Sequence, residues 1–486
     1  MSQTYDIAFL GGGPAGYQGA LRAAQLGARV AVVEKMFVGG VCLNRGCIPT
    51  KTLRASAEVG RCLRRAREYG FKPVEALPDI AAIIARKQRV VSSLRRSIEG
   101  LFQARGIELI EGPGRLAGHG EIELQNSGEP FRVEAGKVVI TTGSRPAGLT
   151  IFPESPRIFL ADEILDISYL PDHLLVVGGG AVGVEMAAIF RELGSRVTLV
   201  EALDHILPHE DREIADNLLS ILKRRKVNVH CGNAIDSVVK SGEGFTVLLS
   251  NGTELTPDTI LQAVGRRPNT EGIGLEQLGI ELDRGCIVVD RHLQTSVPKH
   301  YAAGDVIGGW LLAHVAFAEG ICAAENALGM GSAMDYRVVP RCVFSIPEYA
   351  SVGISEEEAR NHYPVRVGRF PFKSLGMAQA LGEFEGLVKI IAHAETDQVL
   401  GAHILGAHAA DLIQEIALAM KSNLSTREIM GTIHTHPTLS EAVLEAVQEL
   451  HGRAIHALPK NLAEGVLDHA GAKVSGSSFR AMDADR

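Results

Sequence analysis

The stretch that decides the fold is YDIAFLGGGPAGYQGALRAAQLGARVAVVEK, residues 5–35. A short apolar run leads into Gly11-x-Gly13-x-x-Gly16, a segment of helical period follows, and a second apolar run ends at Glu34. This order predicts a β-strand, a tight turn, an α-helix and a second, parallel strand. Glycines in such a turn let the backbone approach a pyrophosphate, and the acid can accept hydrogen bonds from ribose hydroxyls. The stretch therefore predicts a dinucleotide-binding unit.

The same unit recurs as HLLVVGGGAVGVEMAAIFRELGSRVTLVEA, residues 173–202. Its glycines Gly178, Gly180 and Gly183 and its acid Glu201 each lie 167 positions after their counterparts, as position 201 does after position 34. A tight turn that needs small residues explains one glycine cluster but not two acids in register. Two dinucleotide units indicate an internal electron relay. A carboxylate at Glu201 favours NAD over NADP, because it accepts a hydrogen bond from a free 2′-hydroxyl and repels a 2′-phosphate.

Composition limits the class of protein. A chain of 486 residues exceeds one hydrophobic core, so about three domains are expected. A net charge of −8 disfavours nucleic acid or an anionic membrane as the partner. No apolar run approaches the ~18 residues of a membrane span, and the first residues resemble a strand rather than a signal peptide. Seven cysteines, mostly scattered, do not indicate a secreted disulfide scaffold. We therefore expect a protein of the reducing cytoplasm.

Two cysteines, Cys42 and Cys47, lie together in GGVCLNRGCIPTK, residues 39–51. A zinc site needs four ligands, and no second close cysteine pair is present, so we expect no metal. Five residues of helix rise by roughly 7.5 Å, whereas the Cα atoms of a disulfide lie about 4.4–6.8 Å apart. The pair therefore cannot lie on one regular helix, and Gly46 and Pro49 supply the break. A strained, easily reduced bridge favours a redox pair, with a buried structural pair as the alternative.

A second reactive constellation is HTHPTLSEA, residues 434–442. Dithiol chemistry needs a base, because only the thiolate attacks. A lone histidine is more often a surface or core residue, but here His434 and His436 are followed by a carboxylate, Glu441. The acid can orient an imidazole and stabilise its cation. This segment therefore supplies the candidate base.

The remaining sequence completes the architecture. KVVITTGSRP (137–146) and TILQAVGRRPNT (259–270) each read as a strand that ends in a turn. After about residue 340 the pattern changes to alternating apolar strands and a long helical run at 409–421, which is typical of an α+β domain. The predicted fold class is α/β, with two Rossmann-like dinucleotide-binding domains followed by an α+β domain.

Together these features resemble the flavoprotein disulfide reductases, from about residue 5 to about residue 456. The resemblance rests on GGGPAGY, GGVCLNRGCIPTK, TTGSRP, GGGAVGVE, AVGRRPN, AAGDV and HTHPTLSEA, of which the cysteine and histidine motifs are the most specific. It implies an FAD-binding domain in two parts (1–147 and 276–340), an NAD-binding domain (148–275), a dimer-interface domain (341–460) and a tail (461–486). The tail matches no motif of the family.

The resemblance also implies the residues that contact each cofactor. Those for FAD are Gly11, Gly13, Pro14, Ala15, Gly16, Glu34, Lys51, Thr142, Gly143, Asp305 and Ala313. Those for NAD are Gly178, Gly180, Val182, Gly183, Glu185, Glu201, Gly265 and Arg266. Val315 and Phe317 depart from the pattern, because many relatives carry a lysine and an acid there.

The same resemblance implies catalytic roles. Cys42 is the interchange thiol that forms a mixed disulfide with substrate, and Cys47 is the thiolate on the flavin side. Lys51 lies near the flavin and pairs with Glu185.

For the histidines, the resemblance makes His436 the acid/base and Glu441 its partner, with His434 secondary. The family forms this site across a homodimer, with the histidine donated by the other subunit. A monomer is therefore expected to be inactive.

Within the family the resemblance is strongest to members that oxidise protein-bound dihydrolipoamide to lipoamide. Two electrons then pass through the Cys42–Cys47 disulfide and FAD to NAD⁺, and the partner is a lipoyl-bearing carrier protein of a 2-oxoacid dehydrogenase or glycine-cleavage complex. The alternatives are a glutathione-type reductase, which prefers NADPH, and a mercuric-type reductase, which carries a further cysteine pair where this chain has none after Cys342. A flavoprotein scaffold subunit is the alternative from another class.

Overall fold

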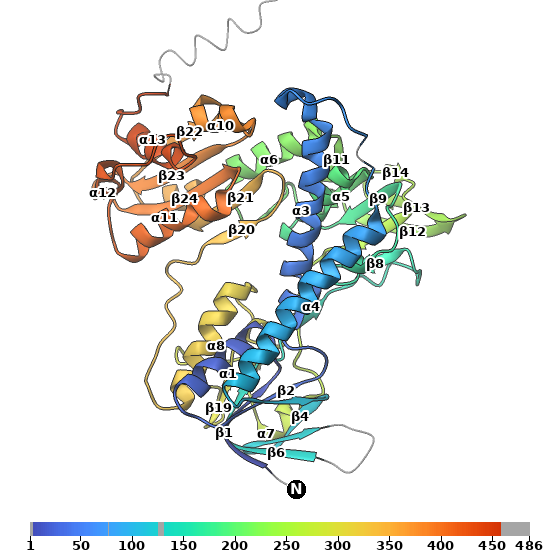
Figure 1. Cartoon of the computed structure of the whole chain (residues 1–486), viewed down its shortest axis with the longest axis vertical. Helices are drawn as coiled ribbons and strands as arrows, with labels where there is room; N and C mark the ends of the chain where they lie inside the picture. The colour runs from blue at the N-terminus through green and yellow to red at the C-terminus, as the bar shows by residue number, and fades with distance from the viewer. Residues whose placement is uncertain (1–2, 76, 125–130, 458–486) are drawn as a thin grey trace, which may run out of the picture.

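The computed structural model describes residues 3–75, 77–124 and 131–457, so the predicted tail at 461–486 lies outside the described residues. Figure 1 shows three bodies. The lower body holds the blue N-terminal strands together with the yellow segment near residue 320. The upper right body holds the green residues, and the orange and red C-terminal residues form the upper left body.

The first sheet carries the N-terminal glycine turn. Its strands are β1 (Gln3–Leu10), β2 (Val30–Glu34), β3 (Glu108–Glu111), β4 (Gly114–Gly118), β5 (Glu121–Leu124), β6 (Phe131–Ile140) and β19 (His300–Ala302). The order is β3-β2-β1-β6-β5-β4, with β19 also paired to β6. Strands β3, β2, β1, β6 and β19 run parallel, whereas β5 pairs antiparallel with both β6 and β4. Residues 7–10 and 30–33 are all buried, as expected for parallel strands covered on both faces.

Two helices, α1 (Pro14–Gln25) and α8 (Ala313–Ala327), pack closely against each other beside this sheet. A Cβ atom at Gly320 of α8 would lie 2.0 Å from the carbonyl oxygen of Ala15, so only glycine permits this approach. The contact joins the first glycine turn to a segment three hundred residues away and makes the lower body one folded unit (Figure 1).

The second sheet repeats the first one. Its parallel strands are β8 (Ile158–Leu160), β9 (His173–Val177), β10 (Arg196–Glu201), β11 (Val227–Cys231) and β15 (Thr259–Gln262), in the order β11-β10-β9-β15-β8. Helix α5 (Ala181–Leu193) follows its glycine turn, and α6 (Arg212–Arg224) follows β10. A small antiparallel sheet of β12 (Ile235–Ser241), β13 (Gly244–Leu249) and β14 (Glu254–Leu255) is inserted before β15. The two units that the 167-residue repeat predicted are thus both present.

The third body is an antiparallel sheet with helices, as the change of pattern near residue 340 predicted. Its strands are β20 (Arg341–Val343), β21 (Glu348–Gly353), β22 (Val365–Pro371), β23 (Leu387–His393) and β24 (Val399–Gly406), in the order β20-β21-β24-β23-β22. Its helices are α9 (Glu356–His362), α10 (Gly376–Leu381), α11 (Ala409–Lys421), α12 (Thr426–Gly431) and α13 (Glu441–Leu450). The predicted fold class is therefore confirmed.

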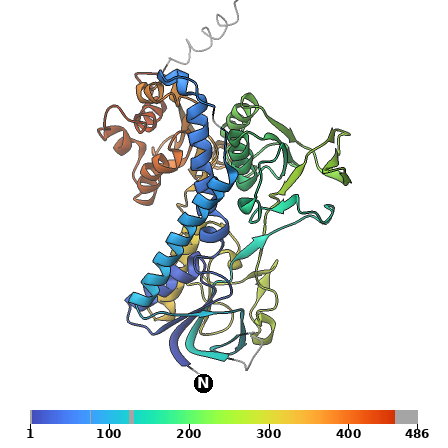
Figure 2. The same cartoon turned by 45° about the vertical axis from the view of Figure 1, so that its right-hand side comes forward.

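Three helices and a short strand pair connect the bodies. Helices α2 (Gly40–Arg45), α3 (Cys47–Arg64) and α4 (Ile80–Ala104) follow β2, and α3 and α4 run from the lower body up beside the two upper ones in both views (Figures 1 and 2). Strands β7 (Ser144–Pro146) and β16 (Arg266–Pro268) pair across the two glycine-turn units. Within the described ranges, no helix has the length and apolarity needed to cross a membrane.

Candidate active site

Cys42 and Cys47 lie on two successive helices. Cys42 belongs to α2, and Cys47 is the first residue of α3. Gly46, with φ −145° and ψ −106°, interrupts the helical conformation between them. Pro49 follows in the first turn of α3, where its missing N–H costs no hydrogen bond. Both cysteines are free thiols and partly buried. The break at Gly46 is what lets the two sulfur atoms come together.

The two thiols differ strongly in acidity. Their mutual hydrogen bond and burial raise the pKa of Cys42 far above its usual value. The same hydrogen bond lowers the pKa of Cys47 to about 7 against the effect of burial, and the charge of Lys51 acts in the same direction. The pair therefore holds its proton on Cys42 and its thiolate on Cys47 near neutral pH.

Lys51 lies one helical turn beyond Cys47 and contacts the second glycine-turn unit. Its Nζ lies 3.1 and 3.2 Å from the two carboxylate oxygens of Glu185 in α5. The ammonium also lies 4.2 Å from the centre of the Phe344 ring, and the backbone N–H of Phe344 donates to Glu185 at 2.8 Å. One side chain from each of the three bodies thus meets beside Cys47. The Glu185 side chain is 8% exposed, so this ion pair is only weakly screened by solvent.

Both glycine turns contain a glycine that packing alone requires. A Cβ atom at Gly16 would lie 1.9 Å from the carbonyl oxygen of Gly11, and one at Gly183 would lie 1.9 Å from that of Gly178. Each helix therefore starts against its own turn, in the same way in both units.

The middle glycines have no such explanation. A Cβ atom at Gly13 would meet nothing closer than 3.8 Å, and one at Gly180 would meet nothing within 4 Å. Both residues have ordinary negative φ values, −68° and −71°, and directly precede a helix. Open backbone at a helix N-terminus fits the close approach of a pyrophosphate, so both turns fit a dinucleotide.

The two acids stand in matching positions. Glu34 accepts hydrogen bonds from the backbone N–H of Gly12 at 2.7 Å and from the backbone N–H of Met36 at 2.9 Å. Glu201 repeats both contacts, at 2.5 and 2.8 Å. Both acids are therefore part of the turn, and each carboxylate oxygen keeps lone-pair capacity for a ribose hydroxyl.

The other residues predicted for FAD lie on several elements of the fold. Pro14 and Ala15 open α1, and Ala313 opens α8. Thr142 donates to the backbone carbonyl of Asn269 at 2.8 Å, and Gly143 has φ +70° with nothing within 4 Å of an added Cβ atom.

Asp305 and Arg266 share a polar contact between the two units. Ser144 donates to Asp305 at 2.5 Å and accepts from Arg266 at 2.7 Å, and Arg266 also contacts Asp162 at 3.0 Å. The assignment of Arg266 to NAD therefore stays a prediction, because its guanidinium is already engaged.

Val182 and Gly265 lie near the second turn with space beside them. Val182 is in the first turn of α5 and is 39% exposed, and Gly265 has φ +114° with nothing within 4 Å of a Cβ atom. At the departing positions, Val315 is buried and the Phe317 ring packs edge-on against Tyr17, with 5.8 Å between centroids.

The histidine segment forms a base–carboxylate pair. His436 Nδ1 lies 2.8 Å from Glu441 Oε1, and the other carboxylate oxygen accepts from the N–H of Thr438 at 2.8 Å. Against burial, which raises it, these two contacts hold the pKa of Glu441 below its usual value. The predicted pair is therefore assembled, with its carboxylate charged.

This pair is not assembled beside the cysteines of its own chain. The His436 side chain is 79% exposed, and His434 instead contacts Glu415 at 2.9 Å. In the part of the chain that the structure describes, no hydrogen bond or ion pair of either histidine reaches Cys42 or Cys47. Figure 1 places α12 and α13, which flank the segment, at the outer side of the upper left body, away from α3.

Sequence reasoning missed Phe344, which contacts both Lys51 and Glu185. No local signal marks it, because the residues that it joins lie 159 and more positions away. It also missed Asn44, whose side-chain amide donates to the carbonyls of Val38 and Gly40 and so fixes the loop before Cys42. Asn44 lies inside the quoted cysteine motif, which was a usable signal. Among the described residues, no group of three or more His, Cys, Asp or Glu side chains is placed to hold a metal ion.

The chain matches known proteins over nearly its whole length. Residues 5–320 match the family described as pyridine nucleotide-disulphide oxidoreductase, and residues 339–447 match its dimerisation domain. The dihydrolipoyl dehydrogenase of Thermus scotoductus is 43% identical, covering 94% of this chain and 99% of its own. That of Bacillus subtilis is 40% identical, with 94% and 100% covered.

Solved structures agree with the sequence relatives. LpdA from Mycobacterium tuberculosis superposes with a TM-score of 0.85 at 33% identity, covering 91% of this chain and 99% of its own. The HOCl-induced flavoprotein disulfide reductase RclA from Escherichia coli, solved as a Cu(II) complex, has a TM-score of 0.85 at 29% identity, with 92% and 99% covered. The family predicted from the motifs is therefore confirmed, and the chain belongs to the pyridine nucleotide-disulphide oxidoreductase family.

Proposed function

We propose that the protein catalyses the dihydrolipoyl dehydrogenase reaction: it oxidises protein-bound dihydrolipoamide to lipoamide and passes two electrons through the Cys42–Cys47 pair and FAD to NAD⁺. The observation that carries this proposal is the unequal pair of thiols beside the Lys51–Glu185 ion pair, at the junction of two dinucleotide turns. Relatives that bear this activity in their names, at 43% and 40% identity, support it.

Cys42 and Cys47 have separate roles in the proposed reaction. One thiolate of dihydrolipoamide attacks Cys42 Sγ of the oxidised pair, the bond between the two cysteines breaks, and Cys47 leaves as a thiolate. The second substrate thiolate then attacks the substrate sulfur of the mixed disulfide, and the bond to Cys42 breaks as lipoamide is released. Cys42 becomes a thiol by taking a proton back from the protonated His436. The low pKa of Cys47 makes it the better leaving group, and the high pKa of Cys42 keeps the proton there.

His436 is the base that accepts the proton of the substrate thiol, and Glu441 orients its ring through Nδ1. His434 stabilises the same segment through its contact with Glu415. Because His436 is exposed at the outer side of its own chain, it serves the cysteines of a second subunit. The functional unit is therefore a homodimer, and the dimerisation domain at residues 339–447 is consistent with it.

The chain's own residues bind and orient both dinucleotides. When bound, FAD supplies the two-electron relay between a dithiol and a nicotinamide. The backbone around Gly13 and the Glu34 carboxylate hold one dinucleotide, and the backbone around Gly180 and the Glu201 carboxylate hold NAD⁺. Lys51 keeps positive charge beside Cys47, and Glu185 fixes its position.

The proposed partner is the lipoyl-bearing carrier protein of a 2-oxoacid dehydrogenase or glycine-cleavage complex, in the cytoplasm. A glutathione-type reductase is disfavoured by the Glu201 carboxylate, which would repel the 2′-phosphate of NADPH. The test is a steady-state assay of the FAD-loaded protein with dihydrolipoamide and NAD⁺, beside assays with NADPH and glutathione disulfide. Turnover with dihydrolipoamide and NAD⁺ is expected, and turnover with NADPH and glutathione disulfide alone would reject the proposal.

A further inference from the structure

Glu210 is an unusually crowded carboxylate outside the catalytic residues. It lies in the second glycine-turn unit, just before α6, yet its side-chain partners among the described residues all belong to the third body. Arg341 donates to both of its oxygens at 2.8 and 3.1 Å, and Tyr349 and Ser351 each donate to Oε2 at 2.8 Å. The Glu210 side chain is 10% exposed, so these are charge-assisted bonds at a partly desolvated site.

The partners of Glu210 define one edge of the third sheet. Arg341 in β20 lies opposite Ser351 in β21, and Val343 lies opposite Tyr349. Glu210 therefore holds the β20–β21 pair at two points, through Arg341 and Ser351 at one end and through Tyr349 at the other. The residue that follows β20 is Phe344, whose N–H donates to Glu185 and whose ring lies under Lys51. The position of β20 thus sets one side of the ion pair beside Cys47.

The backbone of Glu210 leads in the other direction, to the second glycine turn. Its N–H donates to the carbonyl of Leu207 at 2.9 Å, and the N–H of Leu207 donates to the carbonyl of Gly179 at 2.8 Å. Leu207 is buried and holds φ +50°, which a non-glycine residue keeps only where surrounding contacts enforce it. Gly179 is the turn residue whose N–H donates to Glu201.

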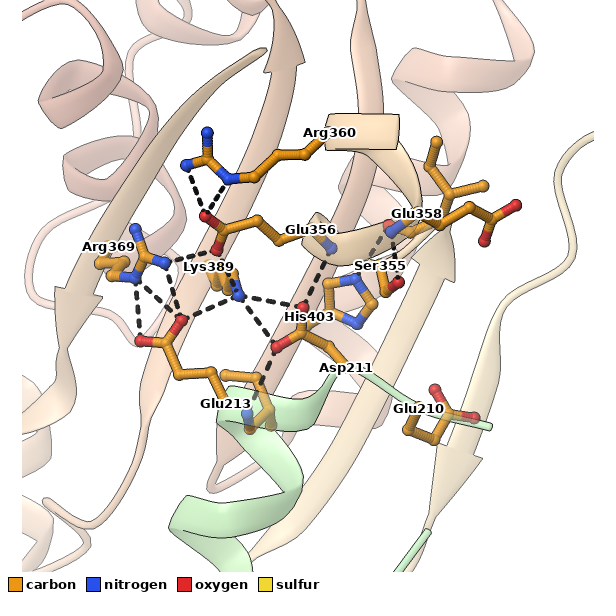
Figure 3. A network of polar contacts seen from close by, with 12 residues as sticks. Glu210, Asp211, Glu213, Ser355, Glu356, Glu358, Arg360, Arg369, Lys389 and His403 are labelled. Atoms are coloured by element: carbon orange, nitrogen blue, oxygen red, sulfur yellow. Dashed lines mark hydrogen bonds and ion pairs between the residues drawn. The ribbon is translucent and has the colours of Figure 1, made fainter. Parts of the chain in front are cut away.

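The residues just after Glu210 anchor the same segment separately. Lys389, with a side chain only 2% exposed, contacts Asp211 at 2.9 Å, Glu213 at 2.8 Å and Glu356 at 2.7 Å. Figure 3 shows this cluster, with Glu210 to one side of it and not among its contacts. The cluster joins the same two bodies but reaches neither β20 nor the loop at Leu207, so it offers a matched control.

From these contacts we infer that Glu210 is a positioning residue for the nicotinamide half of the reaction. It couples the turn that holds Glu201 to the strand that presents Phe344 to Glu185, so one carboxylate aligns both ends of the NAD⁺ site. It touches neither the cysteines nor the histidine pair in the described chain. The inference rests on the proposed use of the second turn for NAD⁺, but not on the identity of the dithiol substrate.

The test uses the FAD-loaded, full-length protein and its Glu210→Gln variant. Glutamine cannot accept the bidentate bond from Arg341, so the guanidinium is left half-satisfied and β20 is released from the turn. We expect the dissociation constant for NAD⁺, measured by equilibrium titration, and the KM for NAD⁺ to rise about tenfold. Reduction of the enzyme by dihydrolipoamide alone should fall by less than the NAD⁺ affinity does, because β20 reaches Cys47 only indirectly, through Glu185 and Lys51. General unfolding would reduce both quantities alike.

The matched control is Glu213→Gln, which removes the same charge from the same segment. It should lower the thermal midpoint and leave NAD⁺ affinity within about twofold of wild type. Tyr349→Phe removes one donor to Glu210 and keeps the fold testable if Glu210→Gln does not fold; a rise of about threefold in the NAD⁺ dissociation constant is expected.

Unchanged NAD⁺ affinity in Glu210→Gln would overturn the inference, as would unchanged NAD⁺ affinity in Tyr349→Phe if Glu210→Gln does not fold. An equal loss of NAD⁺ affinity in Glu213→Gln would also overturn it. So would a loss in the rate of reduction by dihydrolipoamide as large as the loss of NAD⁺ affinity. A wild-type protein that binds NAD⁺ but does not turn over dihydrolipoamide would reject the proposed function, while the NAD⁺ affinities would still decide the role of Glu210.

Discussion

Lys51 of α3 and Glu185 of α5 form an ion pair, with Nζ 3.1 Å from Oε2, that joins the two glycine-turn units beside Cys47. The two residues lie 134 positions apart and come from two different helices, α3 and α5. Lys51 lowers the pKa of Cys47, whereas Glu185 raises it. The pair therefore balances two opposing charges at the thiolate, and its members can be tested separately.

Removing the charge of Lys51 and removing that of Glu185 should shift the pKa of Cys47 in opposite directions. Lys51→Met should raise the pKa of Cys47 above about 7, and Glu185→Gln should lower it. The measurement is the pH dependence of Cys47 alkylation in the reduced protein, read by mass spectrometry. Turnover of Lys51→Met should fall on the order of tenfold. Shifts of the same sign in both variants would contradict this account.

The hydrogen bond between the two cysteines is the largest cause of the low pKa of Cys47. Cys42→Ala removes the S–H donor and should move the alkylation midpoint of Cys47 upward, so that less thiolate is present at pH 7. Cys42→Ser keeps a hydroxyl donor and should leave the midpoint nearer to wild type. Equal midpoints in the alanine and serine variants would show that the hydrogen bond is not the cause.

Mixing inactive subunits should restore activity. Homodimers of Cys42→Ser and of His436→Gln should each be inactive, because each lacks a required group in both sites. After dissociation and reassociation, a mixed dimer holds one site with both groups, so about one quarter of wild-type activity is expected from equal amounts. Each variant reassociated with itself is the control, and no recovery in the mixture would place the base in the same subunit as its cysteines.

Coenzyme choice should depend on the charge of Glu201. Glu201→Gln keeps an oxygen that accepts a backbone hydrogen bond but removes the repulsion of a 2′-phosphate. The kcat/KM for NAD⁺ should fall about tenfold while that for NADP⁺ rises, so the ratio of the two values becomes smaller. Glu34→Gln, the matching change in the first unit, should leave this ratio unchanged.

The buried cluster around Lys389 should govern acid stability. Against burial, which raises them, Arg369 and Lys389 hold the pKa of Glu213 below its usual 4.5, and Lys389 and Arg360 do so for Glu356. Because these folded-state pKa values are depressed, their contribution is present above pH 4.5 and is lost as pH falls further. Thermal unfolding against pH measures this loss.

Lys389→Met leaves Asp211 buried without its partner and should cost about 3–5 kcal/mol of unfolding free energy at pH 7. The variant should also lose much of the decline between pH 5 and pH 3, because the cation that depressed the carboxyl pKa values is gone. Arg360→Gln, which removes an exposed cation from the edge of the cluster, should cost less than about 1 kcal/mol. A decline as steep in Lys389→Met as in wild type would contradict the role of Lys389.

Several features were predictable because their signals are local. The 167-residue repeat predicted two strand–turn–helix–strand units, since parallel strands buried on both faces need continuous apolar runs and the turns need glycine. The spacing of Cys42 and Cys47 predicted a break at Gly46, because a helix cannot bring them together. The pairing of His436 with Glu441 lies within six residues of chain and was equally accessible.

The sequence by itself determined the two dinucleotide units, the redox pair and the family to which the chain belongs. The resemblance also anticipated the Cys47 thiolate and the Lys51–Glu185 pair. Only the tertiary structure decided how Phe344 joins that pair and how Glu210 fastens one body to another. These contacts join residues that lie 131 and 159 positions apart in the chain, at partly desolvated junctions where small differences in distance set the charge balance. A linear pattern carries backbone periodicity, but it does not carry the distances between separate folded bodies.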